Sequence, residues 1–230
     1  MTKEKQRPIS KVAIIGGKGR IGSVLQKGLK GFQIETLDFP DLDVRNYGEL
    51  VKKITGFDAL IHLAWNPNIE QIRESAWTTD YDSDNSLMTF NIYKAAMESE
   101  VRRVIMASSV HADSYLKYKG KESLIVDSIP TPDSPYGANK IFMEALGRYY
   151  SKKGLEVICV RFGGVNLENK PPKDKPFEFP VWLYHEDLWS MINACLKAET
   201  VPNNFSVFYA ISNNKGRIHD TSNPFGWKPK

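Results

Sequence analysis

The sequence predicts an α/β fold built on a doubly wound parallel sheet, and three observations support this prediction. Apolar runs rich in β-branched residues alternate with amphipathic stretches, as strands and helices do in βαβ units. A glycine-rich turn directly follows the first apolar run. The 230 residues, 41% of them hydrophobic and 25% charged, can bury one sizeable core. We therefore expect one domain over residues 1–230, in which about 163–230 form a small C-terminal substrate lid.

The alternation predicts six strands and five helices. One helix has signals at both ends: Ser134 before Pro135 gives an N-cap with proline at the first helical position, and Gly154 follows a basic last turn. The Pro- and Lys-rich stretch 169–180 is expected to be a loop near a ligand. The predicted strands are 11–15, 32–37, 57–63, 103–107, 155–162 and 206–211, and the predicted helices are 21–29, 46–54, 83–99, 135–152 and 185–197.

Composition and charge exclude several classes of protein. The net charge of +4 is spread along the chain, and its lysine clusters carry no interleaved aromatic residues, so nucleic acid is not an expected partner. No apolar run approaches membrane-spanning length, and the N-terminus lacks the apolar core of a signal peptide. Cys159 and Cys195 lie in apolar or amphipathic stretches, as buried thiols of a reducing compartment do. We therefore expect a cytoplasmic protein without membrane association, and no residue spacing predicts a metal site.

The turn after the first predicted strand holds Gly16, Gly19 and Gly22 at G-x-x-G-x-x-G spacing. Such a turn lets backbone N–H groups approach a pyrophosphate at the N-terminus of a helix. Asp38 ends the next predicted strand, where a carboxylate reaches the adenosine ribose hydroxyls and repels a 2′-phosphate. The sequence therefore predicts NAD as the cofactor. NADP is a weaker alternative, which Arg20 and Lys18 keep open because a cation beside the ribose could receive that phosphate.

Three Tyr and Lys pairs have the spacing of four residues that brings two side chains to one face of a helix. They are Tyr115 with Lys119, Tyr136 with Lys140, and Tyr149 with Lys153. The first pair lies in a Lys-rich stretch without helical periodicity, and the third lies where its helix ends. Tyr136 and Lys140 occupy the first turns of the predicted helix 135–152, where Lys140 and the helix dipole are expected to lower the pKa of the tyrosine. We interpret this pair as catalytic, with Tyr136 as the general base and Lys140 holding the cofactor ribose.

Ser109 follows the predicted strand 103–107, and the carboxyl ends of strands are where open α/β sheets bind ligands. Its hydroxyl is expected to orient the oxygen of the substrate. Serine is also common in plain turns after a strand, and Ser108 is the alternative. We prefer Ser109 as the third catalytic residue.

Taken together, these residues resemble the extended short-chain dehydrogenase/reductase superfamily, specifically its NAD-dependent epimerase/dehydratase group, over nearly the whole chain. The resemblance implies a Rossmann fold, and a homodimer formed by the helices 83–99 and 135–152. It also implies adenine contacts at Asp43 and Val44. The implied cofactor site consists of Gly16, Gly19, Arg20, Ile21, Gly22, Asp38, Asp43, Val44, Leu63, Ala64, Trp65, Asn85, Tyr136 and Lys140.

Within this group, the segments 107–111, 182–188 and 225–230 are similar to those of uronate dehydrogenases. Two positions depart from that pattern: Val110 stands where an asparagine is expected, and Phe177 stands where an arginine grips the uronate carboxylate. Lys175 is close enough in sequence to replace that arginine, but a neutral sugar is an equal alternative. The implied substrate-binding residues are Ser109, Val110, His111, Arg161, Lys175 and Phe177.

The resemblance implies hydride transfer between a sugar carbon and NAD, with a small-molecule sugar as the partner. One rival is a nucleotide-sugar epimerase, which uses the same three catalytic residues and returns the hydride. Only 69 residues follow Arg161, a short allowance for a nucleotide-sugar domain, so the epimerase is the less favoured hypothesis. A second rival is a non-enzymatic NAD-binding partner protein, which would leave the Ser, Tyr and Lys set unexplained.

Overall fold

The computed structural model of the chain describes residues 8–66, 83–120, 122–127 and 129–230. Its centre is a sheet of six strands in the order β2-β1-β3-β4-β5-β6, in which every neighbouring pair is parallel. The predicted fold is therefore confirmed, and the predicted strand ends shift by one or two residues at most. The strands are β1 (Lys11–Ile15), β2 (Gln33–Leu37), β3 (Ala59–His62), β4 (Arg103–Ser109), β5 (Glu156–Phe162) and β6 (Phe205–Ala210).

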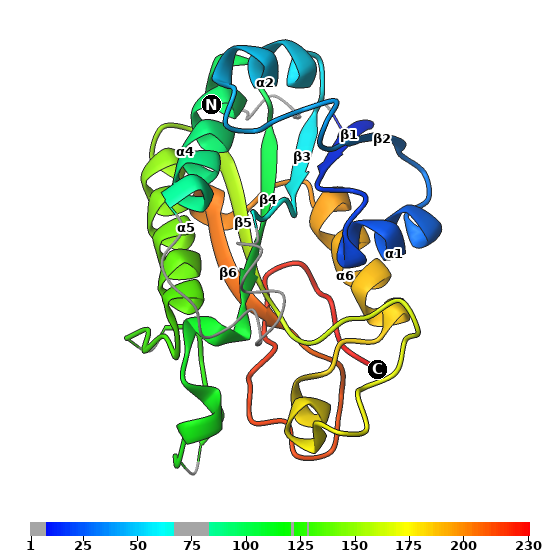
Figure 1. The fold of residues 1–230 in the computed structure, drawn as a ribbon, viewed down its shortest axis with the longest axis vertical. Helices are drawn as coiled ribbons and strands as arrows, with labels where there is room; N and C mark the ends of the chain where they lie inside the picture. The colour runs from blue at the N-terminus through cyan, green and yellow to red at the C-terminus, as the bar shows by residue number, and fades with distance from the viewer. Residues whose placement is uncertain (1–7, 67–82, 121, 128) are drawn as a thin grey trace.

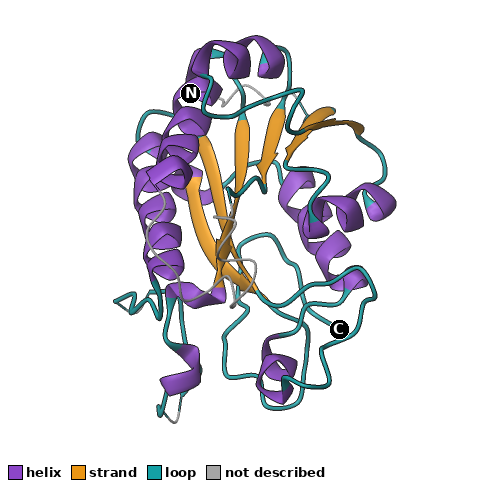
Figure 2. Ribbon diagram, in the orientation of Figure 1, coloured by secondary structure: helices purple, strands orange, loops and turns teal. Residues whose placement is uncertain are grey.

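Helices cover both faces of this sheet, which gives three layers (Figures 1 and 2). One face packs against α1 (Arg20–Gly28) and α6 (His185–Lys197), and these elements share a continuous apolar core with the sheet. The other face packs against α2 (Tyr47–Ile54), α4 (Ser83–Glu98) and α5 (Pro135–Ser151) around a second core. The five helices predicted from the sequence are all present.

The local chemistry of the sequence explains where the best-defined helix begins. The Ser134 hydroxyl accepts a hydrogen bond from the Gly137 N–H at 3.1 Å, and Pro135 occupies the first helical position of α5. The chain then leaves the helix at Gly154, whose φ of +103° few other residues adopt. These local signals define the two ends of α5.

The order of the strands determines where a ligand can bind. From β1 the chain passes to β2 on one side and then to β3 on the other side, so the connections diverge at the carboxyl end of β1. Open α/β sheets bind ligands in the crevice at such a point. The glycine-rich turn, the residues after β2 and β3, and the end of β4 all reach this edge.

The stretch from residue 163 onward contributes to the core as well as to the loops. Its α6 and β6 complete the helical layer and the sheet, while the intervening loops lie beyond the carboxyl ends of the central strands (Figure 1). The predicted loop 169–180 contains part of a short 3₁₀ helix, η3 (Pro176–Val181). A second unpredicted 3₁₀ helix, η2 (Tyr115–Lys117), lies in the Lys-rich stretch and ends before Lys119.

Candidate active site

A cavity of about 1550 Å³ lies at the carboxyl edge of the sheet. This volume exceeds the roughly 300–1,000 Å³ of a pocket for one drug-sized molecule. The wall is made by residues that follow β1, β2, β3, β4 and β5, and most of the predicted site residues belong to it. The predicted residues that line the cavity are Gly16, Gly19, Arg20, Ile21, Gly22, Asp38, Asp43, Val44, Leu63, Ala64, Trp65, Ser109, Val110, His111, Tyr136, Lys140, Lys175 and Phe177. Asn85 and Arg161 do not line it.

The glycine-rich turn packs so closely that side chains are excluded. Gly16 has a φ of +84°, and a Cβ there would lie 2.5 Å from the Ala64 backbone nitrogen. A Cβ on Gly22 would lie 2.5 Å from the Cα of Gly17. Gly19 is the N-cap of α1, and no side chain caps the first N–H groups of this helix. The turn therefore presents backbone donors to the cavity, which suits a pyrophosphate group.

Asp38 is fixed by the backbone around it. Its Oδ2 accepts a hydrogen bond from the Lys18 N–H at 2.6 Å, and its Oδ1 accepts one from the Phe39 N–H at 2.9 Å. The carboxylate therefore ties the glycine-rich turn to the end of β2, a role that the sequence did not reveal. Its cavity-lining position also suits the predicted contact with ribose hydroxyls.

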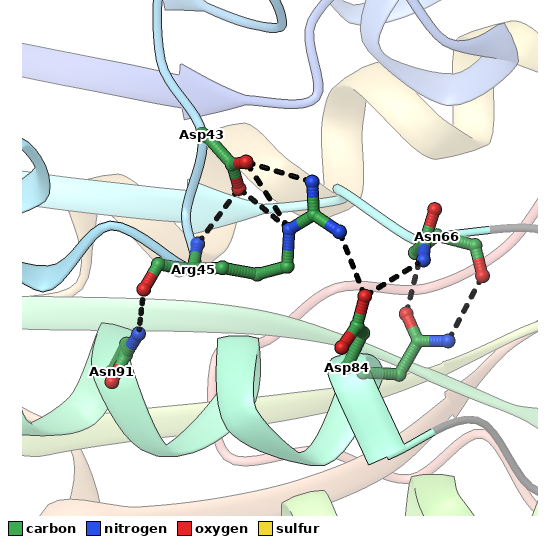
Figure 3. A network of polar contacts seen from close by, with 6 residues as sticks. Asp43, Arg45, Asn66, Asp84 and Asn91 are labelled. Carbon is green, nitrogen blue, oxygen red and sulfur yellow. Dashed lines mark hydrogen bonds and ion pairs between the residues drawn. The ribbon is translucent and has the colours of Figure 1, made fainter.

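Arg45 lines the cavity and is the centre of a network of polar contacts (Figure 3). It donates to both carboxylate oxygens of Asp43, with Nη2 at 2.7 Å and Nε at 2.9 Å, and its Nη1 donates to Asp84 at 2.7 Å. The hydrogen bonds and charge of Arg45 lower the pKa of Asp43. On α4, Asn91 donates to the carbonyl of Val44 at 2.9 Å. These contacts hold the predicted adenine-binding segment against α4.

Asn85 has a different place from the one expected. Its side-chain oxygen accepts from the Asn66 N–H at 2.8 Å, and its Nδ2 donates to the Asn66 carbonyl at 3.0 Å. Asn85 is buried, with 2% of its surface exposed. The expected direct cofactor contact is therefore corrected: Asn85 fixes the backbone that follows β3 and acts on the cavity through it.

The three predicted catalytic residues meet in the wall of the cavity. The phenol of Tyr136, in the first turn of α5, is hydrogen-bonded to Ser109 at the end of β4. The Lys140 ammonium lies 4.1 Å from the centroid of the Trp65 ring and 5.2 Å from that of the Tyr136 ring. Trp65 in turn packs edge-on against Tyr136, with their ring centroids 4.9 Å apart. An aromatic wall thus surrounds the lysine charge.

Burial controls the proton affinities of this pair. Desolvation raises the pKa of Tyr136 to about 12, although the hydrogen bond from Ser109 and the charge of Arg20 favour the phenolate. Desolvation also lowers the pKa of Lys140 to about 7. The expectation that Lys140 and the helix dipole lower the pKa of Tyr136 is therefore wrong for the protein by itself. The periodicity of the sequence gave the spacing of the pair but not the depth of its burial.

We expect the stability of the protein to reveal the buried Lys140. Because its pKa is lower in the folded than in the unfolded state, the unfolded chain binds more protons between about pH 7 and pH 10.5, and stability rises with pH there. Lys140→Met removes this contribution. The gain in unfolding free energy of the variant over the wild type should be about 2–3 kcal/mol larger at pH 7 than at pH 9.5 in urea titrations. Lys153→Met, on the exposed end of the same segment, serves as the control, and an equal pH dependence of both variants would contradict the assignment.

Asp133 is a site residue that the sequence analysis missed. Its Oδ2 lies 2.7 Å from Nδ1 of His111, and its backbone N–H donates to the His111 carbonyl at 3.3 Å. The His111 ring lies 5.9 Å from the Tyr136 ring, centroid to centroid. Asp133 also accepts from the hydroxyl of Ser134, the N-cap of α5. Its place just before a helix cap was the available signal, but its partner comes from a different segment.

Arg161 does not fit the role expected for it. It is 1% exposed, and its Nε and Nη2 each donate at 2.8 Å to a carboxylate oxygen of Glu144. Its Nη1 donates to Asp113 and, at 3.0 Å, to the Tyr209 hydroxyl. Ser108 donates to the same Glu144 at 2.5 Å. Arg161 is thus a buried structural cation, and the expected contact with a sugar is corrected.

The cavity wall also contains residues from the end of β4 and from the loop that follows β5. It includes the predicted Val110, Lys175 and Phe177, together with Glu178, which was not predicted. The Lys175 ammonium lies 3.5 Å from Oε1 of Glu178. Within the described part of the chain, no group of three His, Cys, Asp or Glu side chains is arranged to hold a metal ion. The described helices also include none long and apolar enough to cross a membrane.

The family model described as NAD dependent epimerase/dehydratase family matches residues 12–177, most of the chain. The match spans the glycine-rich turn, the three residues predicted to be catalytic and most of the cavity wall. The chain belongs to this family. The resemblance inferred from the sequence is confirmed.

Two proteins with similar sequences are sugar dehydrogenases. The chain is 28% identical over 251 residues to the L-arabinose 1-dehydrogenase (NAD(P)(+)) of Haloferax volcanii, covering 96% of this chain and 97% of that protein. It is 26% identical to the uronate dehydrogenase of Pseudomonas syringae, covering 91% of this chain and 77% of that protein. Both of these relatives are thus sugar dehydrogenases by name.

Solved structures with a similar fold include a uronate dehydrogenase. The uronate dehydrogenase from Agrobacterium tumefaciens superposes with a TM-score of 0.74 at 26% identity, covering 96% of this chain and 84% of that one. A variant of that enzyme solved as a complex with NAD also has a TM-score of 0.74, at 25% identity. The shared fold therefore extends over nearly all of this member of the family.

Proposed function

We propose that the chain is an NAD-dependent oxidoreductase that transfers a hydride between a sugar carbon and NAD. One observation carries the proposal: Ser109, Tyr136 and Lys140 meet in the wall of a cavity that also contains the glycine-rich turn. Membership of the epimerase/dehydratase family and the sugar dehydrogenases among its relatives support the same reaction.

The residues of the cradle fit a dinucleotide. Uncapped N–H groups at the start of α1 suit the pyrophosphate, and the cavity-lining carboxylate of Asp38 suits the adenosine ribose. Asp43 and Val44 would border the adenine, and Lys140 would hold the second ribose. When bound, NAD supplies the hydride acceptor and a positive charge on its nicotinamide ring. A carboxylate at Asp38 favours NAD over NADP, because it repels a 2′-phosphate.

Tyr136 is the proton acceptor in this proposal. Its phenolate oxygen takes the proton of a substrate hydroxyl as the carbon that carries this hydroxyl loses a hydride, so an alcohol becomes a carbonyl. Ser109 orients the substrate oxygen from the end of β4, and His111 contacts the rest of the sugar. If the reacting carbon is anomeric, the product is a lactone. The high pKa of Tyr136 in the protein alone means that neighbouring positive charge is needed to form the phenolate near neutral pH.

Incubating the purified protein with a sugar panel tests this proposal directly. The panel contains free aldoses, uronates and nucleotide-sugars, each with NAD and with NADP, while reduced cofactor and sugar products are both followed. We expect stoichiometric NADH, with NAD used better than NADP. An epimer formed without net NADH would instead identify a nucleotide-sugar epimerase, and silence from the whole panel would favour a non-enzymatic NAD-binding protein.

We also propose that the protein is a cytoplasmic homodimer, with α4 and α5 paired across a two-fold axis. Leu87 and Phe90 on α4 and Phe142 and Tyr149 on α5 leave between 41% and 52% of their surface exposed. An apolar group of this kind on two adjacent helices is typical of an interface. Sedimentation equilibrium should then give twice the chain mass of 26.1 kDa, and a monomer at micromolar concentration would contradict the dimer.

The proposed cytoplasmic location is supported by the two buried free thiols, Cys159 and Cys195, which suit a reducing compartment.

A further inference from the structure

The part of the cavity lined by His111, Asp133, Lys175, Phe177 and Glu178 is called here the sugar end. Among the described residues that line it, Lys175 is the one permanent cation, while Asp133 and Glu178 are both carboxylates. Phe177 adds an apolar ring that is half exposed. A site that binds an acidic sugar needs a cation able to pair with its carboxylate, as a bidentate arginine does. Whether Lys175 can do so depends on its neighbours.

Glu178 already pairs with this lysine. The Lys175 ammonium lies 3.5 Å from Oε1 of Glu178, and the backbone holds the two residues together because the Glu178 N–H donates to the Lys175 carbonyl at 2.9 Å. The Glu178 side chain is 21% exposed, so it is partly shielded from solvent. The charge of Lys175 is therefore cancelled within one turn of η3. A substrate carboxylate would have to compete with a carboxylate that is tethered three residues away.

Asp133 contributes a second carboxylate to the sugar end. Its pairing with His111 Nδ1 favours the tautomer with the proton on Nδ1, which makes Nε2 an acceptor suited to a sugar hydroxyl. Tyr115 lies beside His111, with their ring centroids 5.9 Å apart. Burial raises the pKa of Tyr115 to about 12, and the charges of Asp133 and Glu178 both act in the same direction. Asp133 therefore adds a negative charge to the same part of the cavity, beside the neutralised pair of Lys175 and Glu178.

We propose that the sugar end selects an uncharged sugar and that Glu178 is the residue that sets this specificity, by neutralising the one cation, Lys175, that could pair with a substrate carboxylate. The inference rests on the proposed oxidation of a sugar and narrows its substrate to the aldoses. It assigns a role to Phe177 as well, as an apolar surface against which the uncharged part of the sugar ring packs.

Matched sugar pairs separate this inference from the proposed function. D-galactose and D-galacturonate, and likewise D-glucose and D-glucuronate, differ only in the oxidation state of C6. We expect the wild type to oxidise the aldose of a pair with a kcat/KM at least tenfold higher than the uronate. NADH formed preferentially from uronates, or equally from both classes, would overturn the inference and leave sugar oxidation standing. NADH from no sugar would overturn the proposed function itself.

The Glu178→Gln variant tests the specific residue. It should raise the ratio of kcat/KM for the uronate to kcat/KM for the aldose at least fivefold, mainly through a lower KM for the uronate. Glu168→Gln is the control, because it removes the same charge from an exposed position that does not line the cavity. Phe177→Arg is a second, independent variant at a half-exposed position. It adds a cation to the sugar end while Glu178 stays in place, and it should also raise the kcat/KM for the uronate. Unchanged uronate kinetics in both cavity variants would overturn the role of Glu178.

Discussion

Tyr136→Phe is expected to lower kcat by about a thousandfold, within the range of about 10²–10⁴ that a positioned general base contributes. The variant loses the phenol oxygen that is hydrogen-bonded to Ser109. The ring itself stays, so the contact with Trp65 at 4.9 Å and the cradle of α1 are unaffected. The loss should therefore appear in kcat, measured as NADH formation under saturating sugar, while the Kd for NADH changes less than threefold in fluorescence titrations.

The control for this experiment is Tyr149→Phe. Tyr149 also has a lysine four residues on, with the Lys153 ammonium 4.7 Å from its ring centroid, but it lies at the exposed end of α5. Its loss should leave kcat unchanged. Comparable activity of the Tyr136→Phe variant and the wild type would show that another group takes the proton.

Arg161→Leu is expected to lower the free energy of unfolding by about 3–5 kcal/mol, the cost of removing one partner from a buried ion pair. The reason is that Glu144 and Asp113 would remain buried without their cation. Urea titration, monitored by circular dichroism, measures this change in unfolding free energy. The melting temperature of the variant should fall as well.

Arg148→Leu provides the matched control for Arg161→Leu. Arg148 lies on the exposed side of α5, where its guanidinium stacks over the Phe205 ring at 4.4 Å. Its loss should cost well under half as much unfolding free energy. Equal costs for the two variants would mean that the buried carboxylates find other partners.

The fold could be predicted because its signals are local. Strands such as β5 are buried along their whole length, so the sequence carries a continuous apolar run there. Ser134, Pro135 and Gly154 determine the ends of a helix through contacts within a few residues. The short 3₁₀ helices, η2 and η3 among them, were missed because segments of this length have no hydrophobic periodicity to detect.

The site was predictable only in part, for the same physical reason. The glycine-rich turn and the Tyr136 and Lys140 spacing are short patterns, and the structure brings them together as expected. Arg161 was misjudged because its partners Glu144 and Asp113 come from distant segments, and pairing across the fold leaves no trace in spacing. The prediction that the pKa of Tyr136 is lowered was wrong for a related reason. Burial raises this pKa, and burial depends on how the whole chain packs.

The segment between β5 and α6 is a loop whose two ends are joined by backbone hydrogen bonds. The Gly164 N–H donates to the Val181 carbonyl at 3.0 Å, and the Leu183 N–H donates to the Gly164 carbonyl at 2.9 Å. These two bonds close the segment 165–181 at its base, so its ends meet at one point of the scaffold. Such a loop can be exchanged or lengthened as a cassette, because closure entropy grows only slowly with length. Selection can thus rewrite substrate choice there while the catalytic trio and the cofactor cradle are inherited intact.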